Sequence, residues 1–108
     1  MEKAVSICLA MYNGERFISE QLSSILPQLS DSDEIVIYDD CSCDRSVEIV
    51  RVFNDSRIRI FEADVNCGHV VTFERALRRA KNDIILFSDQ DDIWAKDHVS
   101  VLRDALEE

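Results

Sequence analysis

Three short stretches of the chain are apolar on both faces, and a fourth alternates between apolar and polar residues. The apolar runs cover residues 4–10, 35–38 and 84–87. Such runs are typical of central strands in a parallel sheet, because both faces of that sheet are covered. Residues 57–61 alternate instead, so we expect this strand to show one face to solvent and to lie near an edge of the sheet.

Between and after these strands, apolar residues recur with the spacing of amphipathic helices. The apolar stripes fall within residues 17–26, 47–53, 73–80 and 99–106. Pro27 follows the first stripe, and Ser42 or Asp44 is a candidate N-cap of the second helix. The pattern therefore predicts four strand–helix units in succession, joined by right-handed crossovers.

This order of elements predicts a single α/β domain over residues 1–108. We expect a Rossmann-like, open and mainly parallel sheet of about four strands, with helices on both faces. By analogy with doubly wound nucleotide-binding halves, the predicted strand order is 3-2-1-4. Ligands of such sheets bind beyond the carboxyl ends of the strands, so the residues that follow each strand are where function is expected.

Charge and composition narrow the possible partners and compartment. The formal net charge of -10 argues against a nucleic-acid or anionic-membrane surface, since both require Lys and Arg. No apolar run approaches the roughly 20 residues that span a bilayer, and no secretory n-region precedes the first apolar stretch, so we expect a cytoplasmic protein. The four cysteines show no secreted disulfide framework, which favours reduced thiols.

Acidic residues gather after two of the predicted buried strands. The first cluster is residues 39–44 (DDCSCD), and the second is residues 88–92 (SDQDD). Converging carboxylates repel each other unless a cation binds between them. Asp89 and Asp91 are suitably spaced to hold Mg²⁺ or Mn²⁺ while leaving positions for water and substrate phosphate. Turns and helix caps alone explain many Asp-rich loops, but two clusters placed directly after buried strands favour the metal site.

Four segments together resemble family 2 glycosyltransferases of the GT-A fold. They are residues 5–14 (VSICLAMYNG), 39–44 (DDCSCD), 66–68 (NCG) and 88–94 (SDQDDIW). Their order and spacing match the family over most of the chain, and the last segment is similar to bacterial members that make surface polysaccharides. Two positions depart from the family pattern: Cys43 stands where Thr is common, and Ala95 stands where members often carry a residue before Pro.

The resemblance implies a role for each predicted site residue. Ala10 and Tyr12 are expected to lie against the nucleotide, and Asp39 to accept a hydrogen bond from the base, typically uracil. Asp91 is expected to be the principal metal ligand, with Asp89 facing the ribose or reaching the metal through water. Asp92 is expected to lie near the sugar or behind the direct metal ligands. Asp40, Ser42 and Asp44 are expected to be structural, shaping their loop and capping the helix behind it.

The resemblance also implies the reaction and which of its catalytic groups this sequence does not contain. The expected function is binding a nucleotide-diphosphate sugar, with UDP-sugars favoured, for inverting transfer to a glycan or lipid-linked acceptor. The catalytic base of such enzymes lies in an acceptor-binding half beyond residue 108, so no catalytic residue is expected here and this portion alone is expected to be inactive. An apolar surface left on the last helix is expected to favour a homodimer, and partners are expected to hold the protein at the inner face of the membrane.

Other side chains carry weaker alternatives. Cys41 and Cys43 could be half of a zinc site, but no second pair stands at zinc spacing. For His69 and His98, which open helices, a capping or surface role is favoured over catalysis. Trp94 is expected to anchor its loop rather than stack on a sugar, and the basic stretch of residues 75–81 is expected to be a solvated face.

Two other functional classes remain open at this point. A phospho-acceptor receiver domain has similar size and an acidic Mg²⁺ pocket, but it carries its acidic pair after the first strand, where this chain has residues 10–13 (AMYN). A non-catalytic sugar-nucleotide-binding or scaffolding module is the second alternative, because the base is not in this sequence.

Overall fold

The computed structural model describes residues 3–89 and 92–107. The strands are β1 (Val5–Met11), β2 (Glu34–Asp39), β3 (Ile58–Glu62) and β4 (Ile84–Ser88). The helices are α1 (Ile18–Ile25), α2 (Ser46–Val52), α3 (His69–Arg78) and α4 (His98–Glu107), with a 3₁₀ turn, η1 (Leu26–Gln28), directly after α1. Strands and helices alternate along the chain, as the hydrophobic pattern predicts.

The four strands form one parallel sheet in the order β3-β2-β1-β4, which confirms the predicted order. In the register, Met11 lies opposite Asp39, and Leu9 lies opposite Ser88. The carboxyl ends of β1, β2 and β4 therefore meet at one end of the sheet, where the loops that follow them can form a common site.

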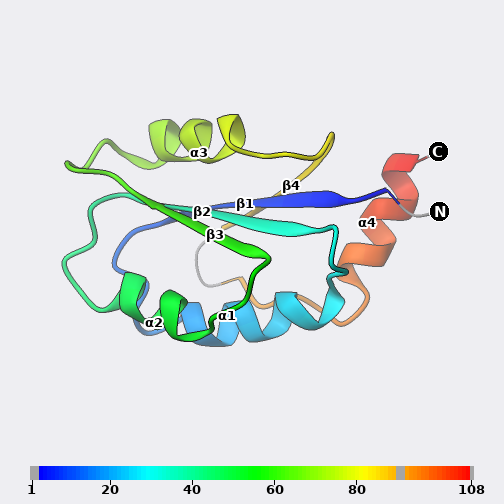
Figure 1. Cartoon of the computed structure of the whole chain (residues 1–108), viewed down its shortest axis with the longest axis horizontal. Helices are drawn as coiled ribbons and strands as arrows, with labels where there is room; N and C mark the ends of the chain where they lie inside the picture. The colour runs from blue at the N-terminus through cyan, green and yellow to red at the C-terminus, as the bar shows by residue number, and fades with distance from the viewer. Residues whose placement is uncertain (1–2, 90–91, 108) are drawn as a thin grey trace.

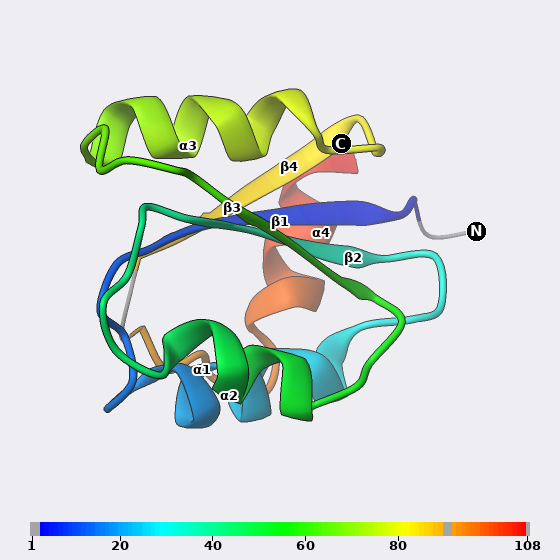
Figure 2. The same ribbon diagram turned by 60° about the vertical axis from the view of Figure 1, so that its left-hand side comes forward.

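Helices cover both faces of the sheet (Figures 1 and 2). α1 and α2 lie on one face, and α3 lies on the other. Alternate residues of β1 and β2 point to opposite faces, and both sets are buried. The set toward α1 and α2 includes Ile7, Leu9, Ile35 and Ile37; the set toward α3 includes Cys8, Val36 and Tyr38. The prediction that these two strands are buried on both faces is confirmed.

The two outer strands of the sheet are β3 and β4. β3 lies at an edge, as its alternating pattern predicts. Among the described residues β4 pairs only with β1 and lies at the other edge. The predicted strand order places it there, although its apolar run is typical of a central strand. α3 packs mainly over β1 and β2, so Phe87 on β4 is only partly covered by that helix. Its ring meets Phe73 of α3 edge-on at 5.5 Å, and the residue is 58% exposed.

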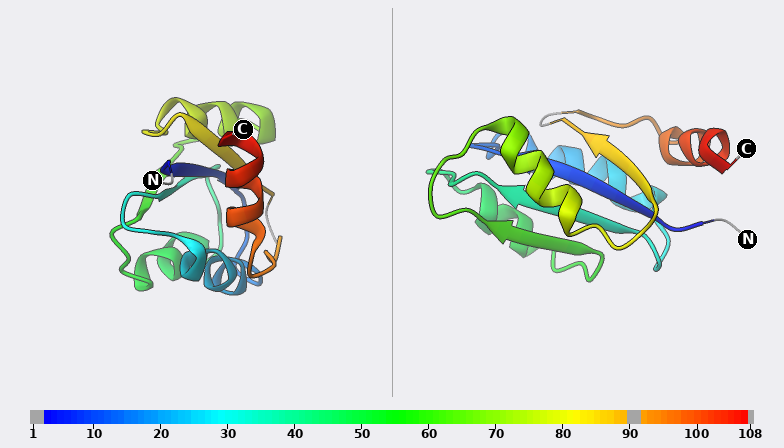
Figure 3. Two further views of the ribbon diagram at one scale, coloured as in Figure 1. Left: turned by 90° about the vertical axis from the view of Figure 1, so that its right-hand side faces the viewer. Right: turned by 90° about the horizontal axis from the view of Figure 1, so that it is seen from above.

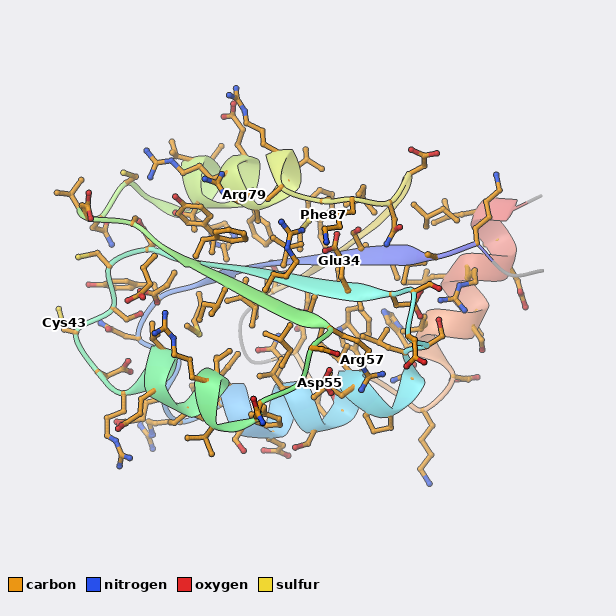
Figure 4. All side chains as sticks on the ribbon, viewed as in Figure 1. Glu34, Cys43, Asp55, Arg57, Arg79 and Phe87 are labelled. Carbon is orange, nitrogen blue, oxygen red and sulfur yellow. The ribbon has the colours of Figure 1, made fainter. Side chains whose placement is uncertain are left out.

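The basic stretch on α3 is only partly the solvated face expected from the sequence. The Arg79 guanidinium lies 4.7 Å from the ring centroid of Phe61 and 5.2 Å from that of Tyr38. Figure 4 shows Arg79 on the α3 side of the sheet. Arg78 does face solvent, where it pairs with Glu74. Stacking of a guanidinium on aromatic faces therefore holds part of this stretch against the sheet.

α4 stands at the amino end of the sheet, far from the carboxyl ends of the strands (Figures 1 and 3). Arg103 of α4 is 5% exposed and donates to both carboxylate oxygens of Asp33, at 3.0 and 2.9 Å. Asp33 also accepts a 2.8 Å hydrogen bond from the Val5 amide. This ion pair attaches the last helix to the start of β1. Within residues 3–89 and 92–107, no helix has the length and apolar character needed to cross a membrane.

Candidate functional site

The loops after β1 and β2 are joined by hydrogen bonds between their side chains and backbones. The Asn13 amide donates to the Ser42 hydroxyl at 2.8 Å, and the Cys43 amide donates to the Asn13 side-chain oxygen at 2.8 Å. Asn13 and Cys41 both have positive φ values, 49° and 63°. Asn tolerates this left-handed conformation better than most residues. Figure 4 shows Cys43 beyond the strand ends, at the outer end of these loops.

A second group of hydrogen bonds ties the same loops to the start of α2. The Gly14 amide donates to the Ser46 hydroxyl at 2.7 Å, and the Glu15 amide donates to Asp44 at 3.1 Å. Asp44 also accepts a 2.9 Å bond from the amide of Ser46, the first residue of α2. The N-cap position itself is Arg45, so neither Ser42 nor Asp44 is the N-cap residue expected from the sequence. Burial tends to raise the pKa of Asp44, but the hydrogen bonds from Ser46 and Glu15 outweigh it and lower that pKa. The two loops are therefore held together by an ionised carboxylate.

Asp39, the last residue of β2, is 2% exposed. Its carboxylate accepts a 3.0 Å hydrogen bond from the Ser42 amide and a second bond from the Ser42 hydroxyl. Asp39 thus shapes the loop that follows β2 as well as lying at the strand end where the base contact is predicted.

Asp40 connects β2 to the start of α3. Its carboxylate accepts hydrogen bonds from the Cys67 amide at 2.7 Å and the Gly68 amide at 3.0 Å. The Asn66 side-chain amide donates to the Asp40 carbonyl at 3.2 Å. Gly68 has φ of 92°, which favours glycine, and α3 begins at the next residue. The expected structural role of Asp40 is confirmed by these contacts, and so is the position of His69 at a loop-to-helix junction.

A pocket of about 360 Å³ opens between the end of β1 and the first turn of α3. Its lining residues come from four segments: Ala10, Met11, Tyr12, Asp40, Asn66, Gly68, His69 and Thr72. The structure therefore brings the predicted residues Ala10 and Tyr12 to the pocket. Asp40 lines it, whereas the buried Asp39 is not among the lining residues.

The loop after β4 is supported by α1. Gln21, fully buried on α1, donates to the Asp89 carbonyl at 2.6 Å and to the Ser88 hydroxyl at 2.9 Å. The Asp89 side chain itself is 74% exposed, and its carboxylate lies 3.9 Å from Nε2 of His69, which lines the pocket. Asp89 is thus at the pocket rim, while the predicted ligand Asp91 lies outside the described residues.

Trp94, another candidate from the sequence, has contacts that give it a structural role. Trp94 is 8% exposed, its amide donates to the Ser24 hydroxyl at 3.0 Å, and its ring packs on His98 at 4.4 Å, so the predicted anchoring role is confirmed.

All four cysteines are free thiols, and the Cys41 thiol donates to the Asp64 carbonyl. No group of three or more His, Cys, Asp or Glu that could hold a metal occurs among residues 3–89 and 92–107.

Sequence reasoning missed the residues that support the site from the side. Gln21 was assigned to the apolar stripe of the first helix, although a Gln in such a stripe is itself a sign of a buried polar contact. Asp40 is expected only to shape its own loop, and Asn66 is noted only as part of the 66–68 segment. Their convergence on one pocket depends on the strand order and on the path of the chain from β3 to α3, which the local pattern does not contain.

Comparison with known proteins identifies the family to which this chain belongs. Residues 6–108 match the profile described as glycosyl transferase family 2. The chain is a member of this family. This family 2 chain is 39% identical over 105 residues to the dTDP-rhamnosyl transferase RfbG of Shigella flexneri. It is 38% identical over 90 residues to WfgD of Escherichia coli, a UDP-Glc:alpha-D-GlcNAc-diphosphoundecaprenol beta-1,3-glucosyltransferase. These alignments cover 91% and 83% of the chain but only 36% of each relative.

Solved structures of glycosyltransferases confirm the predicted GT-A fold. TarS 1–349 of Staphylococcus aureus, in complex with UDP-GlcNAc, superposes on 96% of the family 2 chain with a TM-score of 0.84 and 30% identity. The mannosyltransferase PcManGT of Pyrobaculum calidifontis, in complex with GDP-Man and Mn²⁺, covers 99% of the chain with a TM-score of 0.86 and 26% identity. The chain corresponds to 30% and 32% of those two structures.

Proposed function

We propose that residues 1–108 are the donor-binding part of an inverting glycosyltransferase and bind a nucleotide-diphosphate sugar, with UDP-sugars favoured. The observation that carries this proposal is the pocket between β1 and α3, which is lined by Ala10 and Tyr12 and bordered by the exposed carboxylate of Asp89. A flat aromatic side chain suits a base, and backbone groups suit a ribose. A carboxylate at the rim suits a metal-bound diphosphate.

The proposal assigns each part of the nucleotide to particular residues, of which Asp39 lies outside the pocket lining. Ala10 and Tyr12 contact the nucleoside, and Tyr12, 45% exposed, offers its ring to the ligand. Asp39 accepts a hydrogen bond from the base through a carboxylate that Ser42 already holds in place. Asp89 faces the ribose or the metal, on a loop whose backbone Gln21 fixes. Rigid support of this kind lowers the entropic cost of ligand binding.

The residues present fit a divalent metal that shares its ligands with the substrate. Asp89 supplies an accessible carboxylate oxygen, the donor type that Mg²⁺ and Mn²⁺ prefer. Such an ion completes its shell with phosphate oxygens and water. Asp91 is proposed as the principal protein ligand. When bound, the ion supplies Lewis-acid stabilisation of the departing nucleoside diphosphate.

Transfer requires a base that removes the proton of the acceptor hydroxyl, which then attacks the anomeric carbon in line and inverts it. We propose that this base and the acceptor-binding part lie outside residues 1–108, so these residues alone bind donor without transferring sugar. The acceptor is a glycan or a lipid-linked glycan. A homodimer and attachment to the inner face of the membrane through partners belong to the same proposal.

Calorimetric titration with UDP tests the donor site. We expect binding in the presence of Mn²⁺ that is lost with EDTA and in Asp91→Ala. The matched control is Asp104→Ala, the same substitution at an exposed position of α4 at the other end of the sheet, which should bind as the wild type does. Absence of UDP binding to the folded wild-type chain in either condition would refute the proposal and favour a scaffolding role.

A further inference from the structure

We propose that His69 is a direct ligand of the divalent metal in the donor site, on the same ion as Asp89. This inference rests on the proposed function, because the ion enters the site with the nucleotide diphosphate. His69 is the one described side chain that both lines the pocket and lies against the Asp89 carboxylate. It comes from the first turn of α3, whereas Asp89 follows β4, so two separate elements supply the pair.

The packing of His69 fixes the direction of its ring. The imidazole meets the Phe73 ring edge-on, with centroids 4.6 Å apart and an interplanar angle of 84°. Phe73 in turn meets Phe87 of β4 edge-on at 5.5 Å. These contacts link α3 to β4 and orient the imidazole while leaving the side chain 62% exposed. A helix-capping role does not require this arrangement, because the amides of Cys67 and Gly68 are already bound by Asp40.

The two side chains are close enough to share one ion. Nε2 of His69 and the nearer Asp89 oxygen are 3.9 Å apart, beyond the roughly 3.2 Å limit of ordinary N–H···O hydrogen bonds. Small divalent ions bind imidazole nitrogen and carboxylate oxygen at about 2.0–2.2 Å. Two such bonds at neighbouring positions of an octahedral ion place their donor atoms about 3 Å apart. Both side chains are largely exposed, so rotation of the side chains brings the two atoms onto one ion without movement of the backbone.

A nitrogen ligand also determines which ion the site prefers. Mg²⁺ is held almost wholly by oxygen ligands and keeps several waters, whereas Mn²⁺ and the later first-row ions accept imidazole readily. A site that combines His69, Asp89 and diphosphate oxygens should therefore favour Mn²⁺ over Mg²⁺. Removal of the imidazole should reduce the affinity for Mn²⁺ by about tenfold or more and leave Mg²⁺ binding nearly unchanged.

Electron paramagnetic resonance of Mn²⁺ bound to the chain, with and without UDP, tests the proposal. A coordinated imidazole gives a ¹⁴N modulation in the spin echo, which a merely structural role for His69 would not produce. We expect this modulation in the wild type, its loss in His69→Gln, and its retention in His98→Gln. The second variant is the matched control, because His98 opens α4 and packs on Trp94.

The outcomes separate this inference from the proposed function. Metal-dependent UDP binding without ¹⁴N coupling, or coupling that persists in His69→Gln, would overturn the role of His69 while the donor site stands. A wild-type chain that binds UDP only when Mn²⁺ is absent would overturn both. His69→Gln is expected to unfold at the wild-type temperature because the side chain is exposed, so a loss of metal affinity is not a folding defect.

Discussion

Asp39 and Asp40 are adjacent and nearly buried, yet their carboxylates have different partners. Asp39 is bound by the amide and hydroxyl of Ser42 in its own loop. Asp40 is bound by the amides of Cys67 and Gly68, which come from the loop before α3. Successive residues at a strand end point to opposite sides of the sheet. One carboxylate therefore stays within its own loop, while the other fixes the start of α3 and lines the pocket.

Asp39→Ala is expected to weaken UDP and uridine by a similar factor, because the lost contact is to the base and not to the phosphates. A hydrogen bond to a charged group contributes about 1.5–3 kcal/mol, so a loss of about tenfold or more is expected. Calorimetry with both ligands measures it. Ser42→Ala is the control, since it removes the hydroxyl bond to Asp39 but keeps the carboxylate, and it should cost less affinity. Unchanged affinity for uridine in Asp39→Ala would contradict the base contact.

At the residue scale, the sequence predicts where polar side chains gather better than it predicts what each one touches. Ala10, Tyr12 and Asp89 lie at the pocket or its rim as expected. The separation of Asp39 from Asp40 was not predictable in full, because the partners of Asp40 lie 27 and 28 positions away in the chain. Hydrogen bonds over such distances depend on tertiary structure, which no local pattern records.

At the scale of elements, α1 supports the loop after β4. Gln21 is the link, because its side-chain amide reaches both Ser88 and the Asp89 carbonyl from a fully buried position. The segment from Asp92 onward then returns along α1, where Trp94 and Gln28 attach it to the helix and to η1. The predicted metal loop is thus positioned by a helix that contributes no residue to the pocket lining.

Gln21→Leu tests this support. The change keeps the volume and the helix but removes the donors to Ser88 and Asp89, so the loop is expected to lose its position. Metal-dependent UDP binding should weaken by about tenfold, as for other residues that orient a metal ligand. Calorimetry measures the affinity, and urea denaturation measures the accompanying loss of stability, about 1–3 kcal/mol for an unpaired buried group.

Gln28→Leu provides the comparison for Gln21→Leu. Gln28 also donates to a backbone carbonyl of the returning segment, at Ala95, but well beyond Asp89. We expect Gln28→Leu to lose stability without losing UDP affinity. An equal loss of UDP affinity in both variants would show that Gln21 acts on the whole fold and not on the Asp89 loop.

The elements themselves were largely predictable. The apolar runs gave β1 and β2, the alternating pattern placed β3 at an edge, and the 3.6-residue spacing gave all four helices. The apolar run of β4 is typical of a central strand, yet β4 is an edge strand among the described residues, because such a run reports the character of its side chains and not the number of neighbouring strands. Leu77 was expected on the inner stripe of α3 and is instead 42% exposed, since the helix rotates to place Thr72 and Ala76 inward.

At the scale of the whole molecule, the two ends of the sheet have different roles. The carboxyl ends of the strands form the pocket, and the amino ends carry buried acidic side chains that hold the fold together. Burial opposes ionisation of Asp33, but hydrogen bonds from Ser30 and Val5 and the charge of Arg103 lower its pKa below the ordinary 3.8. Burial likewise opposes ionisation of Glu34, and bonds from Ser6, Arg59 and Lys81 lower its pKa below 4.5.

These lowered pKa values predict how stability depends on pH. Because the folded state holds the protons of Asp33 and Glu34 less tightly than the unfolded state, their contribution is fully present above pH 4.5, the higher of the two ordinary values. It is lost progressively as the pH falls through the folded-state pKa values. Urea denaturation between pH 7 and the acid limit should therefore show falling stability below that point, with a shallower decline in Glu34→Gln.

Asp104→Asn is the control for the acid titration. Asp104 is exposed on α4, and this substitution should leave the acid decline as steep as in the wild type. A Glu34→Gln chain that loses stability with acid as steeply as the wild type would contradict the assignment of this decline to the amino end of the sheet.

The return of the chain along α1 to α4 has a practical consequence for handling the protein. The start of β1 and the last turn of α4 lie on the same side of the molecule, at the end of the sheet opposite the pocket (Figures 1 and 3). An affinity tag, a fluorophore or a sensor surface joined at either place is separated from the pocket by the length of β1. Immobilised chains would therefore present the pocket to the solution in a uniform orientation.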